Sequence, residues 1–227
     1  MTTSLQPHVA KAKHKSATES ELKFTLCSTE VAELIQYLNQ NFATQPTLQL
    51  SNAYFDTAAG DLHQLRIGCR IRRWQLNGQQ HAEQTIKLAG CVTNGLHQRP
   101  EYNLPQGKQE TPNLTSFPTH IWPDSFDIEV VNRALQCMFK VEFQRRCWHY
   151  KLSVGELEAG VEVVLDQGFI TAGEQSEAVL ELEVELQSGP IEALYKVAEM
   201  LRSRYKLVEF NKSKAERGFA LAFNQVR

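Results

Sequence analysis

The feature that most constrains the fold of this chain is a set of segments in which apolar and charged residues alternate with a period of two. In residues 178–187, Leu and Val occupy one set of alternate positions, and Glu181, Glu183 and Glu185 occupy the other. Because successive side chains of a β-strand point to opposite faces, this pattern predicts a strand with one apolar and one charged face. Seven other segments are interpreted as strands: 19–26, 48–56, 66–75, 82–89, 98–104, 140–152 and 160–167.

Helical periodicity is confined to shorter segments between these strands. We expect helices over 30–41, roughly 125–137, from Pro190 to about Leu201, and 214–223. The stretch 105–124 is rich in Pro, Thr and Asn and is predicted to be a long loop.

No internal repeat or domain boundary is visible along the chain. We therefore expect one domain over residues 18–227, which the 227-residue chain is long enough to build around a sizeable core. Residues 1–17 are polar and mildly basic, and are predicted to form a disordered arm.

The charged faces of the predicted strands differ in sign. The strand 178–187 carries three glutamates in a row, whereas the strand 66–75 aligns Arg66, Arg70 and Arg72. Like charges at neighbouring positions of one face repel each other. A metal cation would relieve the repulsion between the glutamates, and a polyanion would do the same for the arginines.

Two architectures are compatible with this pattern. In the first, the charged faces are the solvated side of an open antiparallel sheet. In the second, about eight strands close into a barrel and turn their charged faces inward. Because the charges are segregated by strand, we expect an α+β, mainly β, fold: a closed eight-stranded antiparallel β-barrel with a charged tunnel and helices packed outside.

Composition excludes several classes of function. The formal net charge is −2, from 24 basic and 26 acidic residues, which gives no overall attraction to nucleic acid or to an anionic membrane. The five cysteines are scattered and form no CxxC pair, as expected for a reduced cytoplasmic protein. No apolar run is long enough for a transmembrane helix, and GxxxxGK[ST], HExxH and GxSxG are all absent.

The residue types point to phosphate chemistry. Clustered carboxylates without His or Cys favour Mg²⁺ or Mn²⁺ over zinc. Arginine and lysine are the side chains that bind phosphate oxygens. Phosphoryl transfer depends mainly on positioning and charge neutralisation, which such a set of side chains can supply.

Several segments together resemble the CYTH, or triphosphate tunnel metalloenzyme, family. The resemblance begins with Glu19-Ser-Glu-Leu-Lys23, an ExExK motif, and extends in order to about residue 223. It includes Tyr54-Phe-Asp-Thr57, Cys69-Arg-Ile-Arg72, Thr85-Ile-Lys87, Gly95-Leu-His-Gln-Arg-Pro-Glu-Tyr-Asn103, Leu165-Asp-Gln-Gly168, Glu181-Leu-Glu-Val-Glu185 and Ser213-Lys-Ala-Glu-Arg-Gly218. Within the family, the chain is most similar to the bacterial inorganic triphosphatases.

This resemblance implies a role for each matching residue. The implied metal ligands are Glu19, Glu21, Glu181, Glu183 and Glu185, with Mg²⁺ or Mn²⁺ as the cofactor. The implied phosphate-binding residues are Lys23, Arg70, Arg72, Lys87, Arg99, Arg145 and Lys214. The implied catalytic set is Glu19, Glu21, Lys23, Glu183 and Glu185, and the supporting tunnel acids are Glu101, Glu162 and Asp166.

The implied activity is hydrolysis of inorganic tripolyphosphate to pyrophosphate and phosphate, on a small-molecule substrate without nucleic acid or membrane. Three alternatives stay open. The chain could be another triphosphate enzyme of the family, such as a thiamine triphosphatase, a class IV adenylate cyclase or an RNA triphosphatase. It could be a non-catalytic polyphosphate-binding module, or an interaction domain with a solvated sheet.

Overall fold

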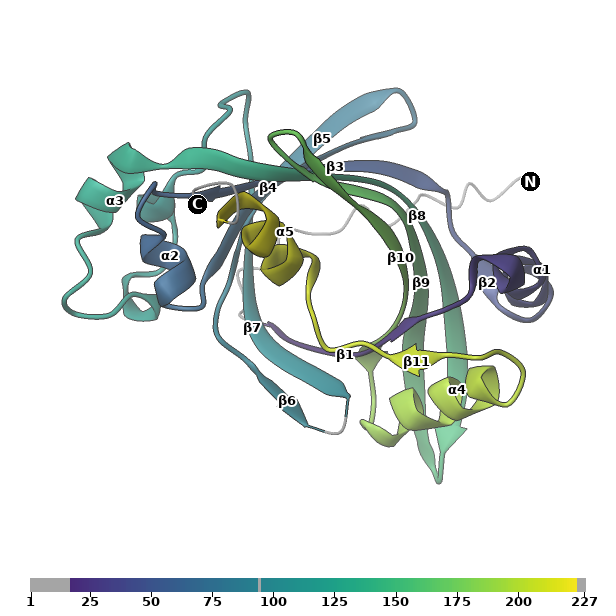
Figure 1. Ribbon diagram of the computed structural model, residues 1–227. Coiled ribbons are helices and arrows are strands. Elements are labelled where there is room, and N and C mark those ends of the chain that lie inside the picture. Colours follow the sequence, from purple (N-terminus) through teal and green to yellow (C-terminus); the bar gives the residue numbers. More distant parts are fainter. Residues whose placement is uncertain (1–16, 94, 224–227) are drawn as a thin grey trace, which may run out of the picture.

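Eight antiparallel strands form a closed barrel in the computed structural model, which describes residues 17–93 and 95–223 (Figure 1). The strands are β1 (Ala17–Thr25), β3 (Leu48–Asp56), β4 (Gly68–Leu76), β5 (Gln79–Lys87), β7 (Leu96–Pro105), β8 (Gln136–Val154), β9 (Leu157–Ala172) and β10 (Gln175–Ser188). Their order around the barrel is β1-β10-β9-β8-β3-β4-β5-β7, and pairing of β7 with β1 closes the ring. The predicted barrel is thus confirmed.

Short strands extend this sheet, and helices cover parts of it. The short strands are β2 (Ala43–Thr44), β6 (Cys91–Thr93) and β11 (Val208–Glu209). The helices are α1 (Val31–Asn41), α2 (Asp61–Gln64), α3 (Ile128–Ala134), α4 (Glu192–Arg202) and α5 (Lys214–Phe223), with 3-10 turns η1 (Ser28–Glu30), η2 (Leu114–Ser116) and η3 (Thr119–Ile121). No helix in the described ranges is long and apolar enough to cross a membrane.

Most element boundaries agree with the sequence analysis, but the start of β4 differs. Strand β4 begins at Gly68, and Arg66 precedes it with φ at +57°, so this arginine is not part of the charged strand face. The arm predicted for residues 1–17 lies, apart from Ala17, outside the described residues.

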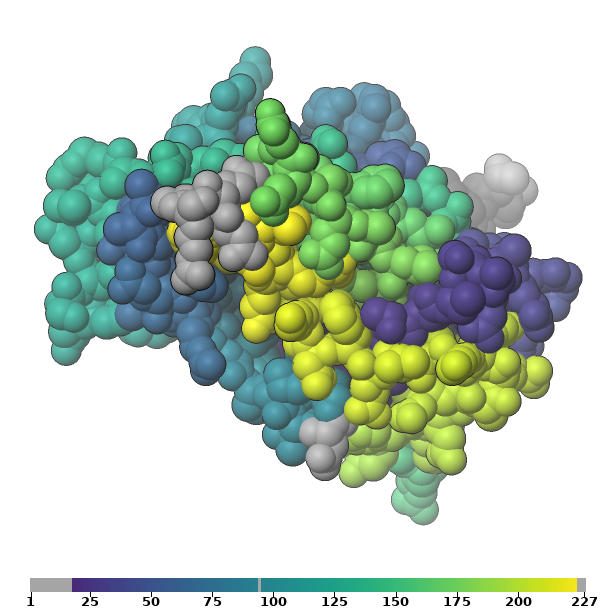
Figure 2. Space-filling view, in the orientation of Figure 1, coloured from purple at the N-terminus to yellow at the C-terminus, as the bar shows by residue number. Residues whose placement is uncertain are grey.

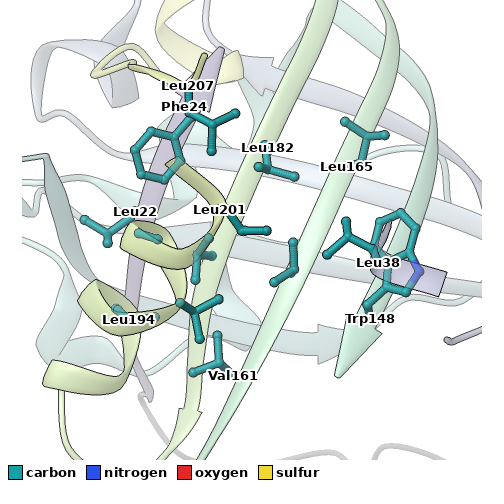
Figure 3. Packing of buried hydrophobic residues seen from close by; sticks show 14 of the residues in the cluster. Leu22, Phe24, Leu38, Trp148, Val161, Leu165, Leu182, Leu194, Leu201 and Leu207 are labelled. Carbon is teal, nitrogen blue, oxygen red and sulfur yellow. The ribbon is translucent and has the colours of Figure 1, made fainter. Parts of the chain in front are cut away.

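The largest apolar core lies outside the barrel wall formed by β1, β10, β9 and β8. Helices α1 and α4 cover this wall, with Leu38 and Leu194 fully buried against it. Figure 3 shows leucines of α4 facing outward-pointing residues of β1, β9 and β10. The alternation expected from the sequence is therefore realised with the apolar face outward and the charged face inward.

A second apolar core covers the outer face of β3, β4, β5 and β7. The predicted loop 105–124 contributes Leu114, Phe117, Ile121 and Trp122 to this core through its two 3-10 turns. The sequence pattern did not reveal this role, because four apolar residues spaced irregularly among prolines and polar residues match neither the helical nor the strand period.

A third apolar cluster lies inside the barrel and contains α5. Phe219 of α5 packs on the ring of Phe139 in β8, whose inner face also carries Val141 and Phe143. A Cβ at Gly218 would lie 2.0 Å from a ring carbon of Phe139, so the helix approaches β8 as closely as only glycine allows. The expectation that helices pack outside holds for α1 and α4, whereas α5 differs because these apolar inner positions leave room for it.

The C-terminal segment consequently closes one side of the tunnel. In Figure 1, α5 lies within the ring of strands, next to β10. Figure 2 shows the yellow C-terminal residues filling the centre of the same face. The N-terminus of α5 points its first residue, Lys214, at the charged residues of the inner wall.

Candidate functional site

The charged residues predicted from the sequence converge on the inner face of the barrel. Many of them are buried, including Glu21, Lys23, Arg70, Asp166, Glu181, Glu183 and Lys214. They come from seven strands and one helix that are far apart in the sequence: β1, β4, β5, β7, β8, β9, β10 and α5. The structure thus gathers the predicted site residues into one lumen.

The N-terminus of α5 places an ammonium group among three carboxylates. Nζ of Lys214 lies 2.5 Å from Glu181, 2.8 Å from Asp166 and 2.9 Å from Glu183. Burial alone would lower the pKa of Lys214, but Asp166 and Glu183 outweigh burial and raise it. The lysine is therefore firmly charged in this structure.

Glu183 is the point where three cations meet. Besides Lys214, its carboxylate contacts Lys23 at 3.2 Å and Arg145 at 3.1 Å. Arg145 also forms a two-pronged ion pair with Asp166, at 2.7 and 2.6 Å. Burial favours the neutral form of Glu183, yet Lys214 and Lys23 hold its pKa well below the usual range.

A second network joins β1, β5 and β7. Nζ of Lys87 lies 2.7 Å from both Glu19 and Glu101, and Arg99 donates to Glu19 at 3.2 Å. Burial would raise the pKa of Glu19, but Lys87 and Arg99 lower it. The predicted division into an acidic and a basic wall is accordingly incomplete, since several acids and bases neutralise each other directly.

One row of side chains remains rich in negative charge. Register places Glu21 of β1 opposite Glu185 of β10, and Glu185 opposite Glu162 of β9. Nε2 of His149 in turn donates a hydrogen bond to the Glu162 carboxylate at 2.7 Å. We call the three glutamates the acidic row.

Two groups in the acidic row are poorly compensated. Burial, followed by the charges of Glu19 and Glu162, raises the pKa of Glu185 to about 8. Burial also raises the pKa of Glu21, although Lys23 opposes the shift. Oε1 of Glu21 is buried and has no hydrogen-bond partner among the described residues. A cation in this row would relieve both conditions.

Across the lumen, two arginines of β4 have donors to spare. Nε of Arg70 is buried without a hydrogen-bond partner in the described part of the chain, and Nη2 of the same side chain lies 3.6 Å from Oε1 of Glu101. Arg72 donates to Asn52 at 3.0 Å, while its ion-pair partner Glu83 is 4.0 Å distant. Burial and the neighbouring guanidinium of Arg70 lower the pKa of Arg72 to about 10. The side of the lumen lined by β4 therefore favours an anion.

The structure also places residues in the lumen that the sequence analysis did not assign. Arg217 of α5 contacts Glu177 and Glu181, and Tyr54 of β3 stacks on Phe139 with ring centroids 4.6 Å apart. His97 lies opposite Glu21 in register and is buried. Arg217 follows Lys214 by three positions in a helical segment, which puts both on one face and could have revealed it.

The described residues contain no preformed metal centre. Within residues 17–93 and 95–223, no group of three His, Cys, Asp or Glu side chains is arranged to hold a metal ion. Glu181 in particular has both carboxylate oxygens engaged, one by Lys214 and one by Arg217. Oε1 of Glu21, in contrast, has no hydrogen bond among the described residues and lies 3.4 Å from Nζ of Lys23, and the pKa of Glu185 is raised; a bound cation would correct both conditions.

Comparison with known proteins supports the fold. The family model for the CYTH domain matches residues 17–219. The chain is 34% identical over 208 residues to a Haemophilus influenzae protein named inorganic triphosphatase, and the alignment covers 91% of this chain and 56% of that protein. The chain thus spans about half the length of this curated relative.

Solved structures share the architecture at lower identity. A Hippeastrum protein, whose structure is described as revealing a dominant triphosphatase activity, has a TM-score of 0.59 at 21% identity, covering 91% of this chain and 96% of that one. The PH1819 protein of Pyrococcus horikoshii has a TM-score of 0.52 at 15% identity, covering 91% and 99%. With its matching model, its relative and its closed tunnel, the chain belongs to the CYTH domain family.

Proposed function

We propose that this protein hydrolyses inorganic tripolyphosphate to pyrophosphate and orthophosphate inside the tunnel, with a divalent cation as cofactor. The proposal rests on two buried groups of opposite charge in the same lumen. Nε of Arg70 and Oε1 of Glu21 are both buried without a hydrogen-bond partner in the described ranges. A triphosphate would satisfy the first group, and a metal ion would satisfy the second.

The arginine side of the lumen would bind the substrate. Arg70 and Arg72 lie two positions apart on β4, a spacing that suits neighbouring phosphates of one chain, and Lys87 on β5 lies opposite Gly68 of β4. Guanidinium groups form paired hydrogen bonds with phosphate oxygens. Lys23, Arg99, Arg145 and Lys214 would release part of their present carboxylate contacts to the incoming phosphates.

The acidic row would hold the cation. We assign Glu21 and Glu185 as the principal ligands, with Glu19 and Glu183 beside them, and keep Glu101, Glu162 and Asp166 as supporting acids. Glu181 is assigned to Lys214 instead of the metal because both its oxygens already have partners. Carboxylate oxygens without His or Cys suit Mg²⁺ or Mn²⁺, and such an ion would neutralise charge on the phosphate oxygens.

Hydrolysis needs water at the terminal phosphorus, in line with the bridging oxygen that leaves. The P–O bond to that oxygen breaks as the new bond forms, giving orthophosphate and pyrophosphate. The part of this chain is to fix the terminal phosphate with its basic residues and to exclude other geometries. A 34% identical relative named inorganic triphosphatase supports this assignment.

As the scattered cysteines indicate, we place the activity in the cytoplasm.

A phosphate-release assay tests the proposal. Tripolyphosphate, ATP and thiamine triphosphate are each supplied with Mg²⁺, with Mn²⁺ and with EDTA. We expect release from tripolyphosphate to exceed release from the other two, and to vanish in EDTA. Preference for an organic triphosphate would reassign the substrate, and tight tripolyphosphate binding without release under any metal condition would identify a binding module.

A further inference from the structure

Arg217 has no role in the proposed chemistry, yet it is among the most tightly held residues of the lumen. It is 8% exposed, donates through Nε to Glu177 at 2.6 Å and through Nη2 to the carbonyl oxygen of Ala178 at 2.6 Å, and its Nη1 contacts Glu181. All three partners belong to β10. One guanidinium group thus fastens α5 to a single strand.

The contact with Glu181 continues to Lys214. Oε1 of Glu181 accepts from Arg217, and Oε2 accepts from Nζ of Lys214 at 2.5 Å. Glu181 is completely buried, so it can act on a bound substrate only indirectly, through these two cations. The series Glu177, Arg217, Glu181 and Lys214 leads from the exposed rim of β10 to the inner wall.

Lys214 requires such fixation because of its place in the helix. It is the first residue of α5, where the partial positive charge of the helix N-terminus opposes an ammonium group. Ser213 and Glu216 fix the start of the helix reciprocally: the backbone N–H of Ser213 donates to Glu216 at 2.7 Å, and that of Glu216 donates to Oγ of Ser213 at 3.1 Å. The hydrogen bonds between Ser213 and Glu216 therefore fix the backbone of Lys214, and the surrounding carboxylates fix its ammonium group.

Resting on the proposed function, we propose that Arg217 and Glu181 are positioning residues for Lys214. Arg217 holds one oxygen of Glu181 so that the other oxygen fixes the Lys214 ammonium group beside Glu183, where it meets a phosphate of the substrate. Neither Arg217 nor Glu181 touches the substrate itself. The two residues act through Lys214 alone.

A double-mutant cycle tests this dependence. Arg217→Met, Lys214→Met and the double variant are compared with the unchanged protein for the Kd of tripolyphosphate in EDTA by calorimetry, and for kcat and KM with Mg²⁺. We expect Arg217→Met to raise Kd about tenfold in the unchanged background, the size typical of residues in one ion-pair network, and to have no further effect when Lys214 is already Met. Arg217→Lys keeps the charge but loses the planar guanidinium group, so it should raise Kd by a smaller factor than Arg217→Met.

Matched controls separate positioning from simple stability. Arg202→Met removes an exposed arginine whose ion pair with Glu209, at 3.1 Å, lies on the outer surface, and it should leave Kd, kcat and KM unchanged. Equal losses from Arg217→Met in both backgrounds, or a lowered Tm with unchanged Kd and kcat in Arg217→Met and Arg217→Lys, would overturn the proposal. If Arg217→Met does not fold, Arg217→Lys completes the same cycle. Absence of phosphate release by the unchanged protein would instead refute the proposed function, while the cycle in Kd would still test the positioning.

Discussion

Glu181 and Glu185 lie on the same face of the same strand, four residues apart, and have opposite surroundings. Glu181 meets Lys214 and Arg217, so each oxygen of its carboxylate has a cation as partner. Glu185 faces Glu21 and Glu162, and burial together with Glu19 and Glu162 raises its pKa to about 8. Identical residues at equivalent strand positions thus have different charged partners, because α5 reaches one and not the other.

This difference distinguishes two regions of the lumen. Around Lys214 the charges are mutually satisfied, which is how a protein stabilises a buried helix end. In the acidic row the charges are not mutually satisfied, as expected for a site that binds a ligand. Four predictions sharpen or break this comparison.

The largest expected effect is on stability at the satisfied end. Glu181→Gln leaves Lys214 and Arg217 buried with one carboxylate fewer, which should lower the free energy of unfolding by about 3–5 kcal/mol. Thermal unfolding in EDTA checks this, and a decrease in Tm of about 10 °C is expected for a chain of this size. Glu158→Gln, an exposed site on β9, serves as the control. An unchanged Tm for Glu181→Gln would show that the network contributes no net stability.

The next effect is on activity at the acidic row. Glu185→Gln should reduce kcat for tripolyphosphate hydrolysis by about 10²–10³-fold, the usual loss when an electrostatic contact at a reacting group is removed. Its Tm should not fall, since the variant replaces a carboxyl group whose ionised form is poorly compensated. Glu21→Gln should behave alike. Phosphate release with saturating Mg²⁺ or Mn²⁺ provides the measurement, and full activity in both variants would refute the metal assignment.

A smaller effect is expected where α5 meets the barrel. Gly218→Ala would force a Cβ into the ring of Phe139, so either the helix or the ring must shift, at a cost of about 1–3 kcal/mol. Because Lys214 is on the same helix, KM for tripolyphosphate should rise as well. The outer glycine of the β4–β5 turn, Gly78, has open space but φ at +77°, so Gly78→Asn makes a control that tolerates this conformation. If Tm falls while KM stays constant, the position of α5 does not affect substrate binding.

The smallest effect concerns pH. The pKa of Glu185 is raised in the folded protein, so the unfolded carboxyl is already ionised while the folded one still holds its proton. Stability from this group is therefore complete at low pH and is lost as pH rises through about 8. In EDTA, Tm of the unchanged protein should fall as pH rises from about 5.5 to about 8, where the unfolded carboxyl is ionised and the folded one is not, and level off above about pH 8.

Comparison with a variant isolates this group from others. Glu185→Gln should show a shallower fall of Tm over the same range, and saturating Mg²⁺ should remove the difference. The acids with lowered pKa values, such as Glu183 and Asp166, are ionised throughout that range and contribute no slope. Parallel Tm profiles for the two proteins would contradict the assignment of the raised pKa to Glu185.

Much of the fold could be predicted because alternation is a local property. Period-two patterns identified all eight barrel strands, and the helix over 214–223 was predicted with the bounds that the structure shows. The inner position of Glu19, Glu21, Lys23, Glu181, Glu183 and Glu185 follows directly from the same alternation. Arg66 was a harder case, since the strand start at Gly68 depends on a residue at positive φ that the pattern does not encode.

The partners of these side chains could not be predicted in the same way. Nothing in the segment around Glu181 distinguishes it from Glu185, and the distinction arises from Lys214 and Arg217, about thirty positions later. The core role of Leu114, Phe117, Ile121 and Trp122 was hidden for a related reason. Irregular segments bury apolar residues according to the surface they cover, not according to a period of their own.

The sequence by itself determined the strands, the sign of charge on each strand face and the motifs of the family, because each depends on neighbours within a few residues. Only the tertiary structure decided which charges are neutralised and which remain available for a ligand. Closure of β1 on β7 and insertion of α5 bring distant charges within a few ångströms, where burial makes each pairing count far more than it would in water.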